Sequence, residues 1–541
     1  MAIQNPIITG FNPDPCICRK GDDYYIITSS FEWFPGIRIY HSTDMVNWAF
    51  KGYALNETRQ LDMMGNPDSG GIWAPDITWH DGLFWIVFTN IKVVNAPWKT
   101  GYNYLITAED IDGPWSDPVL LGAGGIDPSL YHADDGRKYL TYRLWGPQHH
   151  SNPHNTIVLQ EYFHEQKKLA PQWKVIFEGT DLKYTEASHI YFKDGYYYLF
   201  TAEGGTRYAH AVTVARSRDI EGPYELHPEW HILSSWDIPR FPLQKAGHGS
   251  LICFGEDEWY MVYLTSRPLK RPEMALLTSE VRGYCPLGRE TAIAKVEWRD
   301  GWPWIQDSHP ALSVQAPADR TTVSRQPEKE YLYDFGRGSL GDELQTLRVP
   351  FSSQLGSLSA RPGHLRLYGN DSLVSTFIQS TVAMRWKHFH FTAETRLSFN
   401  PIHFQQSAGL TCYYSTQCWS YCCVTTDYDG QRVLKLMEVD KGEARYWLWD
   451  AGIGIPQDVE YIWLKVTVDG LHYSYSYSFD GHKWEILPYQ LASWKLSDDY
   501  NIGKGFFTGA FVGLHCEDIS HQSCFADFDY LHYVPHEPQA S

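Results

Sequence analysis

Five polar residues stand at the head of five similar segments in the first three hundred residues of the chain. Four of them carry a carboxyl group and one carries an imidazole: Asp14, Asp76, Asp127, Glu186 and His248. Such groups exchange protons with substrates, so a cluster of them could carry out acid–base chemistry. For any single aspartate the alternative is structural, because aspartate also caps turns and accepts bonds from backbone N–H groups.

Each leading residue is followed by a short apolar strand, a turn containing Gly or Asp, and a strand rich in aromatic residues. A turn of this kind between two apolar runs is typical of a β-hairpin. The leading residues are 62, 51, 59 and 62 positions apart, and further hairpins follow at 37–48, 102–115 and 211–224. The pattern predicts a five-bladed β-propeller over residues 1–305. A pair of β-sandwiches is the other all-β arrangement, but it leaves the five matched units unexplained.

The first strand of a propeller blade lines the central channel. Residues at the same place in each repeat would therefore lie on one ring around that channel. Several carboxylates in an apolar channel are costly to bury, and such costs are commonly tolerated at functional sites. The repeat thus predicts a functional site at the centre of the propeller.

The remainder of the chain lacks this repeat. Residues 306–328 lose the aromatic density and gain Pro, Ser and Thr, which is typical of a linker. Residues 329–541 contain longer alternating runs such as FTAETRLSF and YIWLKVTVDG. These runs predict a C-terminal β-sandwich of the concanavalin-like jelly-roll type. Its expected roles are to brace the propeller, to shape the site, or to bind sugar as a separate module.

Composition excludes several classes of partner. The formal net charge of −19 disfavours nucleic acid and anionic membranes, both of which require positive surface. The start of the chain, MAIQNPIITG, lacks the features of a secretory signal, and no apolar run approaches the roughly 18 residues that span a membrane. None of the ten cysteines forms a C-x-x-C pair, which argues against zinc, and their low density argues against a disulfide scaffold. We therefore expect a cytoplasmic protein.

Five motifs resemble family 43 of the glycoside hydrolases, in its β-xylosidase/α-L-arabinofuranosidase branch. They are NPDP at 12–15, WAPD at 73–76, GIDPSL at 125–130, TEASHI at 185–190 and GHGS at 247–250. The resemblance covers essentially the whole chain and implies a five-bladed propeller followed by a β-sandwich. It also implies hydrolysis of a glycosidic bond with inversion.

The resemblance assigns roles to three carboxyl groups. Asp14 would be the general base, Glu186 the general acid, and Asp127 the residue that tunes the pKa of the acid and orients it. Inverting hydrolysis needs a carboxylate that activates water and a carboxylic acid that protonates the leaving oxygen. A nearby anion raises the pKa of the acid because it makes ionisation less favourable.

Residues for substrate binding follow from the same resemblance. Phe31, Trp73 and Trp145 would stack on a sugar ring, although core packing is the alternative for each. Arg289 resembles the substrate-binding arginine of the family. His248 resembles a channel histidine that in some members lies beside bound calcium, so an indirect role at calcium is allowed, whereas no cofactor is expected to be required.

The segment GKGFFTGAFVG (503–513) would contribute one phenylalanine to the pocket, either Phe507, which we favour, or Phe506. A pocket closed on one side admits only a chain end, which implies an exo-acting enzyme. The loose cluster His149, His150 and His154 lies in a Ser-, Asn- and Pro-containing segment and is not expected to bind metal.

The predicted function is therefore release of D-xylose from the non-reducing end of β-1,4-xylooligosaccharides. Activity on α-L-arabinofuranosides, as the main or a secondary reaction, stays open. A non-catalytic sugar-binding propeller and a scaffold for protein partners are the alternatives from other classes. Similar β-xylosidases form dimers or tetramers, so a homo-oligomer is allowed for.

Overall fold

The computed structural model describes residues 2–94, 99–122, 124–145, 156–272, 282–318, 330–502 and 507–536. The chain forms two compact units. The first unit consists of Met1–Leu61, Gly70–Gly283 and Arg289–Gln326, and the second consists of Asp62–Ser69, Tyr284–Gly288 and Pro327–Ser541. Two short segments within the range predicted for the propeller therefore belong to the second unit, which the sequence pattern did not predict.

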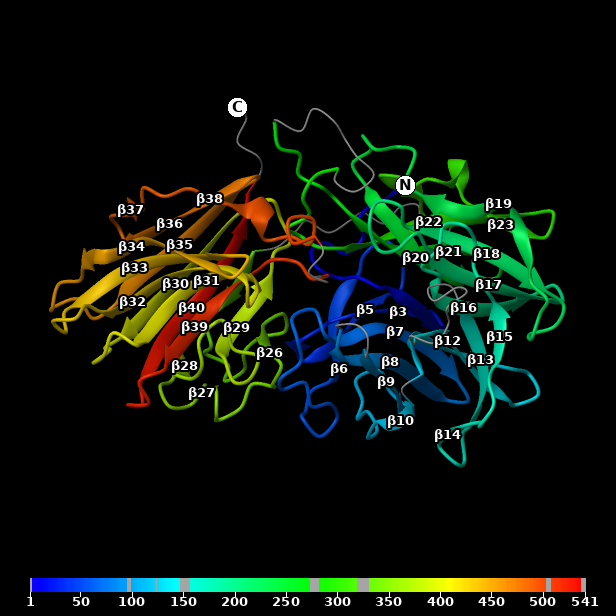
Figure 1. Ribbon diagram of the computed structural model, residues 1–541, viewed down its shortest axis with the longest axis horizontal. Helices are drawn as coiled ribbons and strands as arrows, with labels where there is room; N and C mark the ends of the chain where they lie inside the picture. The colour runs from blue at the N-terminus through cyan, green and yellow to red at the C-terminus, as the bar shows by residue number, and fades with distance from the viewer. Residues whose placement is uncertain are drawn as a thin grey trace. The chain divides into compact units, whose positions relative to one another are not determined.

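The first unit contains five separate antiparallel sheets, which follow one another along the chain in Figure 1 from blue to green. Blade 1 has the order β2 (Cys16–Lys20), β3 (Asp23–Thr28), β5 (Gly36–Ser42), β6 (Ala49–Leu55). Blade 2 has β7 (Gly71–His80), β8 (Leu83–Val93), β9 (Thr100–Ala108), β10 (Val119–Gly122). Blade 3 has β11 (Gly125–His132), β12 (Lys138–Leu144), β13 (Ile157–Phe163), β14 (Lys168–Leu169), with β15 (Lys174–Phe177) also paired to β13.

Blade 4 has β16 (Glu186–Lys193), β17 (Tyr196–Glu203), β18 (Ala211–Ser217), β19 (Glu225–Ser234). Blade 5 has β20 (Gln244–Phe254), β21 (Glu258–Ser266), β22 (Glu290–Arg299), β23 (Trp302–Trp304). The first strands contact one another around a common centre: β2 with β7, β7 with β11, β11 with β16, and β20 with β2. The predicted five-bladed propeller is confirmed.

The N-terminal stretch joins the last blade. β1 (Ala2–Gln4) pairs antiparallel with β24 (Ser313–Gln315), and Ile8 forms a bridge with Thr291 of β22. The Asn5 side chain adds hydrogen bonds to the backbone of Ile293. Residues nearly 300 positions apart are thereby tied together, which holds the start of the chain against blade 5.

The second unit is a β-sandwich, as predicted. One sheet has the order β27 (Gly356–Ser357), β28 (Leu365–Tyr368), β40 (Phe525–Pro535), β30 (His390–Phe399), β35 (Ile462–Asp469), β36 (His472–Ser478), β37 (Glu485–Ile486), with β25 (Tyr331–Tyr333) on β40 and β38 (Leu491–Ala492) on β36. The other contains β34 (Glu443–Gly454), β33 (Arg432–Asp440), β32 (Cys418–Thr426), β31 (Gln406–Ser415), β39 (Phe511–Asp518), β29 (Ser380–Arg385), β26 (Gln345–Leu347).

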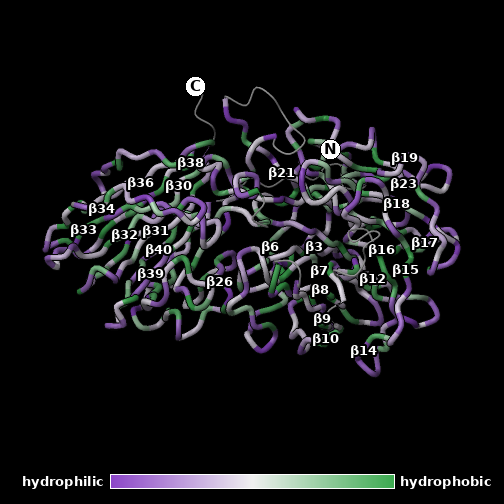
Figure 2. Tube along the Cα trace, in the orientation of Figure 1, coloured by the Kyte–Doolittle hydropathy of each residue, from purple (hydrophilic) through white to green (hydrophobic). Residues whose placement is uncertain are grey.

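Alternation of side chains creates the core of the sandwich. Buried residues alternate with half-buried or exposed residues along β30 and β35, as expected for strands with one face on a core. Their buried residues join one cluster with those of the opposite sheet. Figure 2 shows hydrophilic residues gathered in the peripheral turns and hydrophobic residues in the strands. Among the described residues, no helix has the length and apolar character that crossing a membrane requires.

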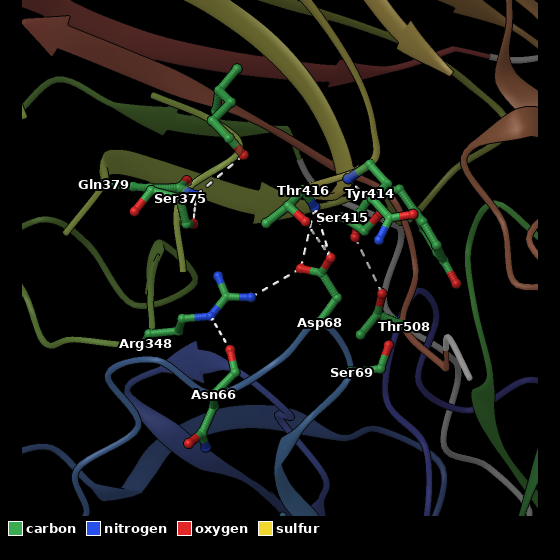
Figure 3. Close-up of polar contacts among 12 residues, drawn as sticks. Asn66, Asp68, Ser69, Arg348, Ser375, Gln379, Tyr414, Ser415, Thr416 and Thr508 are labelled. Carbon is green, nitrogen blue, oxygen red and sulfur yellow. Dashed lines mark hydrogen bonds and ion pairs between the residues drawn. The ribbon is translucent and has the colours of Figure 1, made fainter. Parts of the chain in front are cut away.

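Asp62–Ser69 is anchored in the second unit by its own polar groups (Figure 3). The buried Asp68 carboxylate accepts a hydrogen bond from Arg348 Nη2 at 2.9 Å and bonds from the backbone and hydroxyl of Thr416. Arg348 Nε also donates to the carbonyl of Asn66 at 2.6 Å. A buried ion pair with these additional bonds satisfies both charges, so this segment has a defined place in the sandwich.

Candidate active site

The first strand of each blade is irregular where the site residues lie. Strands β7, β11, β16 and β20 each contain a β-bulge, and a residue with left-handed backbone lies at each bulge. Blade 1 has the same feature immediately before β2. The five left-handed residues are Asp14, Ala74, Asp127, Ala187 and His248, with φ between 38° and 53°. Strain of this kind in non-glycine residues is typical of sites where side chains are aimed for function.

The positions of these left-handed residues correct the prediction that all five leading residues lie on one ring around the channel. Asp14, Asp127 and His248 occupy the left-handed position of their blades, but in blade 2 that position holds Ala74 and in blade 4 Ala187. Glu186 therefore lies one residue earlier and Asp76 two residues later. Asp76 instead lies just after the bulge, at the point where β7 pairs with β8 again. It therefore belongs to a second layer of residues along the channel.

Asp14 is held by two basic side chains. Arg289 Nη1 donates to Asp14 Oδ1 at 2.5 Å, and His248 Nδ1 lies 3.7 Å from the same oxygen. All three side chains are buried. Burial by itself raises the pKa of Asp14, but the Arg289 charge and the neighbouring His248 outweigh it and lower the pKa from 3.8 to about 2. Asp14 is therefore an ionised, oriented carboxylate at neutral pH.

Asp127 and Glu186 are neighbouring carboxyl groups in the same channel. Arg143 of β12 donates from Nη1 to Glu186 Oε2. Asp127 is buried, and burial together with the negative charges of Glu186 and Asp14 raises its pKa well above the usual value, against the opposing effect of Arg143. The Asp127 carboxyl therefore holds its proton to a higher pH than an ordinary aspartate does, whereas Asp14 gives its proton up more readily.

The second layer contains Asp76, Cys16 and His189. His189 Nδ1 lies 3.2 Å from Asp76 Oδ1, the Cys16 thiol donates to the same oxygen at 3.1 Å, and the Leu130 N–H donates to Oδ2 at 3.0 Å. Burial raises the pKa of Asp76, but the bonds and charge of His189 and the Leu130 N–H lower it below the usual value overall. Asp76 thus ties together the first strands of four blades.

The predicted wall residues form a row of aromatic rings. Ring centres are 5.9 Å apart for Phe31 and Trp73 and 6.3 Å apart for Trp73 and Trp145. Phe31 is buried, whereas the two tryptophans are half-buried. The Arg289 guanidinium carbon lies 5.5 Å from the centre of the Phe31 ring, so the arginine that holds Asp14 also contacts this row.

Of the other predicted residues, one belongs to the second unit and the rest lie outside the described residues. Phe507 is described, and its backbone N–H donates to Ser69 Oγ at 2.8 Å within the second unit. Its entry into the pocket stays a prediction. Phe506 and the cluster His149, His150 and His154 lie outside the described residues.

Three residues of the site were missed. Arg143 contacts Glu186, Lys99 lies 4.5 Å above the Trp145 ring, and His189 contacts Asp76. Burial and the Arg143 charge lower the pKa of Lys99, while Glu186 acts in the opposite direction. His189 stands in TEASHI and could have been found there, but Arg143 is a single basic residue within an ordinary strand and carries no such signal.

Comparison with known proteins agrees with this geometry. Residues 3–303 match glycosyl hydrolases family 43, and residues 333–534 match the beta xylosidase C-terminal concanavalin A-like domain. The chain belongs to glycoside hydrolase family 43. A protein from Escherichia coli (strain K12) is 58% identical to this family 43 enzyme over 99% of this chain and 100% of its own.

Two further relatives span the whole family 43 chain. A beta-xylosidase of Bacillus subtilis (strain 168) is 49% identical over 98% of this chain and 99% of its own. A crystal structure of a xylan beta-1,4-xylosidase from Bacillus halodurans covers 98% of this chain and 100% of its own, with 43% identity and a TM-score of 0.93. The predicted family is therefore confirmed for both domains.

Proposed function

We propose that the protein is an exo-acting, inverting β-xylosidase that releases D-xylose from the non-reducing end of β-1,4-xylooligosaccharides. The observation that supports the proposal most is that the pKa values of two channel carboxyl groups are shifted in opposite directions. One of them, Asp14, is held ionised by Arg289, whereas burial and the charges of Glu186 and Asp14 raise the pKa of Asp127. Inverting hydrolysis requires one ionised and one protonated carboxyl function at the same time.

Asp14 acts as the general base. Its carboxylate accepts a proton from the water that attacks the anomeric carbon, while Arg289 fixes the carboxylate orientation. A base with a pKa of about 2 is weak, so its contribution depends on placing the water accurately. The Asp14 side chain is buried and lies against both Arg289 and His248, which supports this role.

Glu186 acts as the general acid, with Asp127 beside it as the residue that tunes its pKa and orients it. Glu186 delivers a proton to the leaving oxygen as the glycosidic bond breaks. Arg143 holds Glu186 in place. The row of Phe31, Trp73 and Trp145 offers flat surfaces on which a pyranose ring can stack.

Calcium does not fit the donor groups of the described channel. Ca²⁺ takes six to eight oxygen ligands. Near His248 the available carboxylate is Asp14, which is already paired with Arg289. The compact set Cys16, Asp76 and His189 offers one carboxylate, one imidazole and a thiol whose pKa is raised by burial and by Asp76. We therefore derive no step through a metal and expect turnover to survive EDTA.

Compartment and assembly are part of the proposal. All ten cysteines are free thiols, eight of them buried, which supports a reducing compartment such as the cytoplasm. A dimer or tetramer is the expected assembly. Cell fractionation and size-exclusion chromatography with light scattering test these two points.

One NMR time course tests the reaction. Xylotriose is added to the enzyme and the anomeric signals are followed at early times. Inverting cleavage releases α-D-xylose first, whereas β-D-xylose as the first product contradicts the proposal. Parallel assays with 4-nitrophenyl β-D-xyloside and α-L-arabinofuranoside decide the sugar. A far better arabinofuranoside substrate would show that the main activity is that of an α-L-arabinofuranosidase.

A further inference from the structure

A cavity lies at the outer edge of the propeller, apart from the channel. Its volume is about 570 Å³, within the range of roughly 300–1,000 Å³ that small-molecule sites occupy. It lies between the outermost strands of blades 4 and 5, β19 and β23, which are side by side in Figure 1. The lining residues all belong to the propeller unit, and none stands on the innermost strand of a blade: they are Glu229, His231, Asp237, Arg299 and residues 304–309.

Hydrogen bonds between blades 4 and 5 hold the walls of this cavity in place. The hairpin of β22 and β23 turns at Gly301, whose backbone is left-handed. The Gly301 carbonyl accepts hydrogen bonds from the Tyr198 hydroxyl and from Arg216 Nη1, both at 2.6 Å. Trp304 Nε1 donates to the Arg299 carbonyl at 3.3 Å. The hairpin is therefore fixed to the strands of blade 4, and the indole ring is fixed to the hairpin.

Trp304 offers a flat apolar surface among lining groups that are otherwise mostly polar. Its ring is half-buried, and the His227 ring packs against it edge-on, with ring centres 4.4 Å apart. Glu229 and Asp307 are exposed, and within the described part of the chain their carboxylates make no hydrogen bond or ion pair. These oxygens are therefore available to a ligand that donates hydrogen bonds.

This combination fits a neutral sugar better than an apolar molecule or a metal ion. Sugar hydroxyls donate to carboxylates, and the C–H face of a pyranose stacks on an aromatic ring. An apolar ligand would desolvate the carboxylates and the Asp237–His309 pair, whose atoms are 2.8 Å apart, without replacing their bonds to water. A metal ion needs donors that converge. Among the described residues, such a set of three donor atoms within 4.8 Å is formed by Cys16, Asp76 and His189, which line the channel and not this cavity.

We propose that this cavity is a carbohydrate-binding site separate from the active site. It takes a β-1,4-xylooligosaccharide, with one pyranose ring on Trp304 and sugar hydroxyls bonded to Glu229 and Asp307. The choice of xylose units rests on the proposed function, because the substrate of the enzyme is the oligosaccharide that the enzyme meets. The site binds the chain and contributes no reacting group.

Isothermal titration calorimetry counts the sites. Xylohexaose is titrated into Glu186→Ala, the variant in which slow turnover leaves the ligand intact. Two sites per chain are expected, one in the channel and one in the cavity. Adding Trp304→Ala should weaken the cavity site by about tenfold, because the contact of a sugar with an aromatic ring contributes affinity of that order. Circular dichroism checks that each variant is folded.

The paired substitution Glu229→Gln and Asp307→Asn tests the same site without touching a buried side chain. Both changes keep the shape of the side chain and remove its charge, so the affinity of the cavity site should fall by about tenfold even if Trp304→Ala does not fold. Trp173→Ala is the matched control. Trp173 is an exposed tryptophan of the same unit outside the cavity, so both sites should keep their affinities within about twofold.

The outcomes separate this inference from the proposed function. A single site in Glu186→Ala, or two unchanged sites in the folded Trp304 and carboxylate variants, overturns the inference. Binding of Mn²⁺ to the cavity in place of xylohexaose, lost in the carboxylate variant, overturns it as well because the ligand is then a cation. Absence of wild-type turnover of xylooligosaccharides contradicts the proposed function, whereas normal turnover with one binding site contradicts only the second site.

Discussion

Arg289, which immediately precedes β22, donates to the same oxygen of Asp14 that His248 of β20 approaches. Two basic groups therefore converge on one carboxylate oxygen in a buried channel. Without them burial would favour the neutral acid, which cannot accept a proton. The basic pair thus determines the protonation state of the residue that we propose as the base.

Replacing Arg289 by Ala should move the acidic limb of the kcat/KM profile. Asp14 acts as a base only when ionised, so activity is present above its pKa and is lost as the pH falls through it. The pKa is about 2 with Arg289 in place, and loss of that charge leaves the raising effect of burial opposed only by His248 and Ser29. We expect the limb to shift upward by roughly two pH units, measured by initial rates between pH 2.5 and 8.

The exposed Arg137 of blade 3 is the control for this shift, since its ion pair with Asp135 lies in solvent. Arg137→Ala should leave the acidic limb in place. The lowered pKa of Asp14 also makes the stability of the protein depend on pH. The lowered pKa of Asp14 contributes about 2 kcal/mol above pH 3.8, and this contribution is lost as the pH falls toward 2. An unchanged acidic limb in Arg289→Ala would show that Arg289 does not set the ionisation of Asp14.

Replacing Glu186 by Ala should affect substrates according to their leaving groups. A general acid matters most when the leaving oxygen is strongly basic, as it is in xylobiose. We expect kcat/KM for xylobiose to fall by about 10²- to 10⁴-fold, whereas 2,4-dinitrophenyl β-D-xyloside, whose leaving group needs no proton, should lose far less. Circular dichroism checks that the variant is folded. Equal losses for both substrates would remove Glu186 from the role of acid.

Gly247 leaves no room for a side chain next to His248. A Cβ atom at this position would lie 2.4 Å from the ring of the buried His210, closer than carbon atoms approach. Gly247→Ala should therefore shift β20, displace His248 and lower the free energy of unfolding by about 1–3 kcal/mol. Thermal unfolding and kcat/KM measure both effects. Gly454→Ala is the control, because a Cβ there meets no atom within 4 Å.

Arg348→Ala should destabilise the protein without touching a catalytic-site group. It removes the cation that pairs with buried Asp68 (Figure 3) and leaves that carboxylate without its charge partner. Breaking a buried pair in this way costs about 3–5 kcal/mol. Denaturant unfolding measures the loss. Lys483→Ala, which breaks a solvent-exposed pair with Glu485, should change stability by less than about 1 kcal/mol.

The fold could be predicted from the sequence because each β-hairpin is specified by a short, continuous stretch of residues. Each hairpin carries its own strands and turn, and five copies indicate five blades whatever their three-dimensional placement. The register around the channel was harder to predict. A bulge adds a residue to one strand without altering the residue pattern, so Asp76 and Glu186 looked equivalent to Asp14 although they are offset from it.

Contacts between distant residues gave no sequence signal. Arg348 bonds a carbonyl 282 positions away, and Asp499 bonds an N–H 214 positions away. Neither interaction alters the composition or periodicity of its own segment. The boundary at 306–328 was therefore placed where composition changes, while the assignment of Asp62–Ser69 and Tyr284–Gly288 to the second unit could not be read from the chain.

The Asp62–Ser69 segment also bears on when the sandwich unit matures in the cell. A ribosome makes Asp68 early, but Arg348 and Thr416, which bind its carboxylate, follow it by 280 and 348 residues. At the usual rates of synthesis they are added roughly 14–70 s later. The Asp68 carboxylate therefore stays hydrated while most of the chain is translated, and it is buried only when the partners that satisfy its charge have been made.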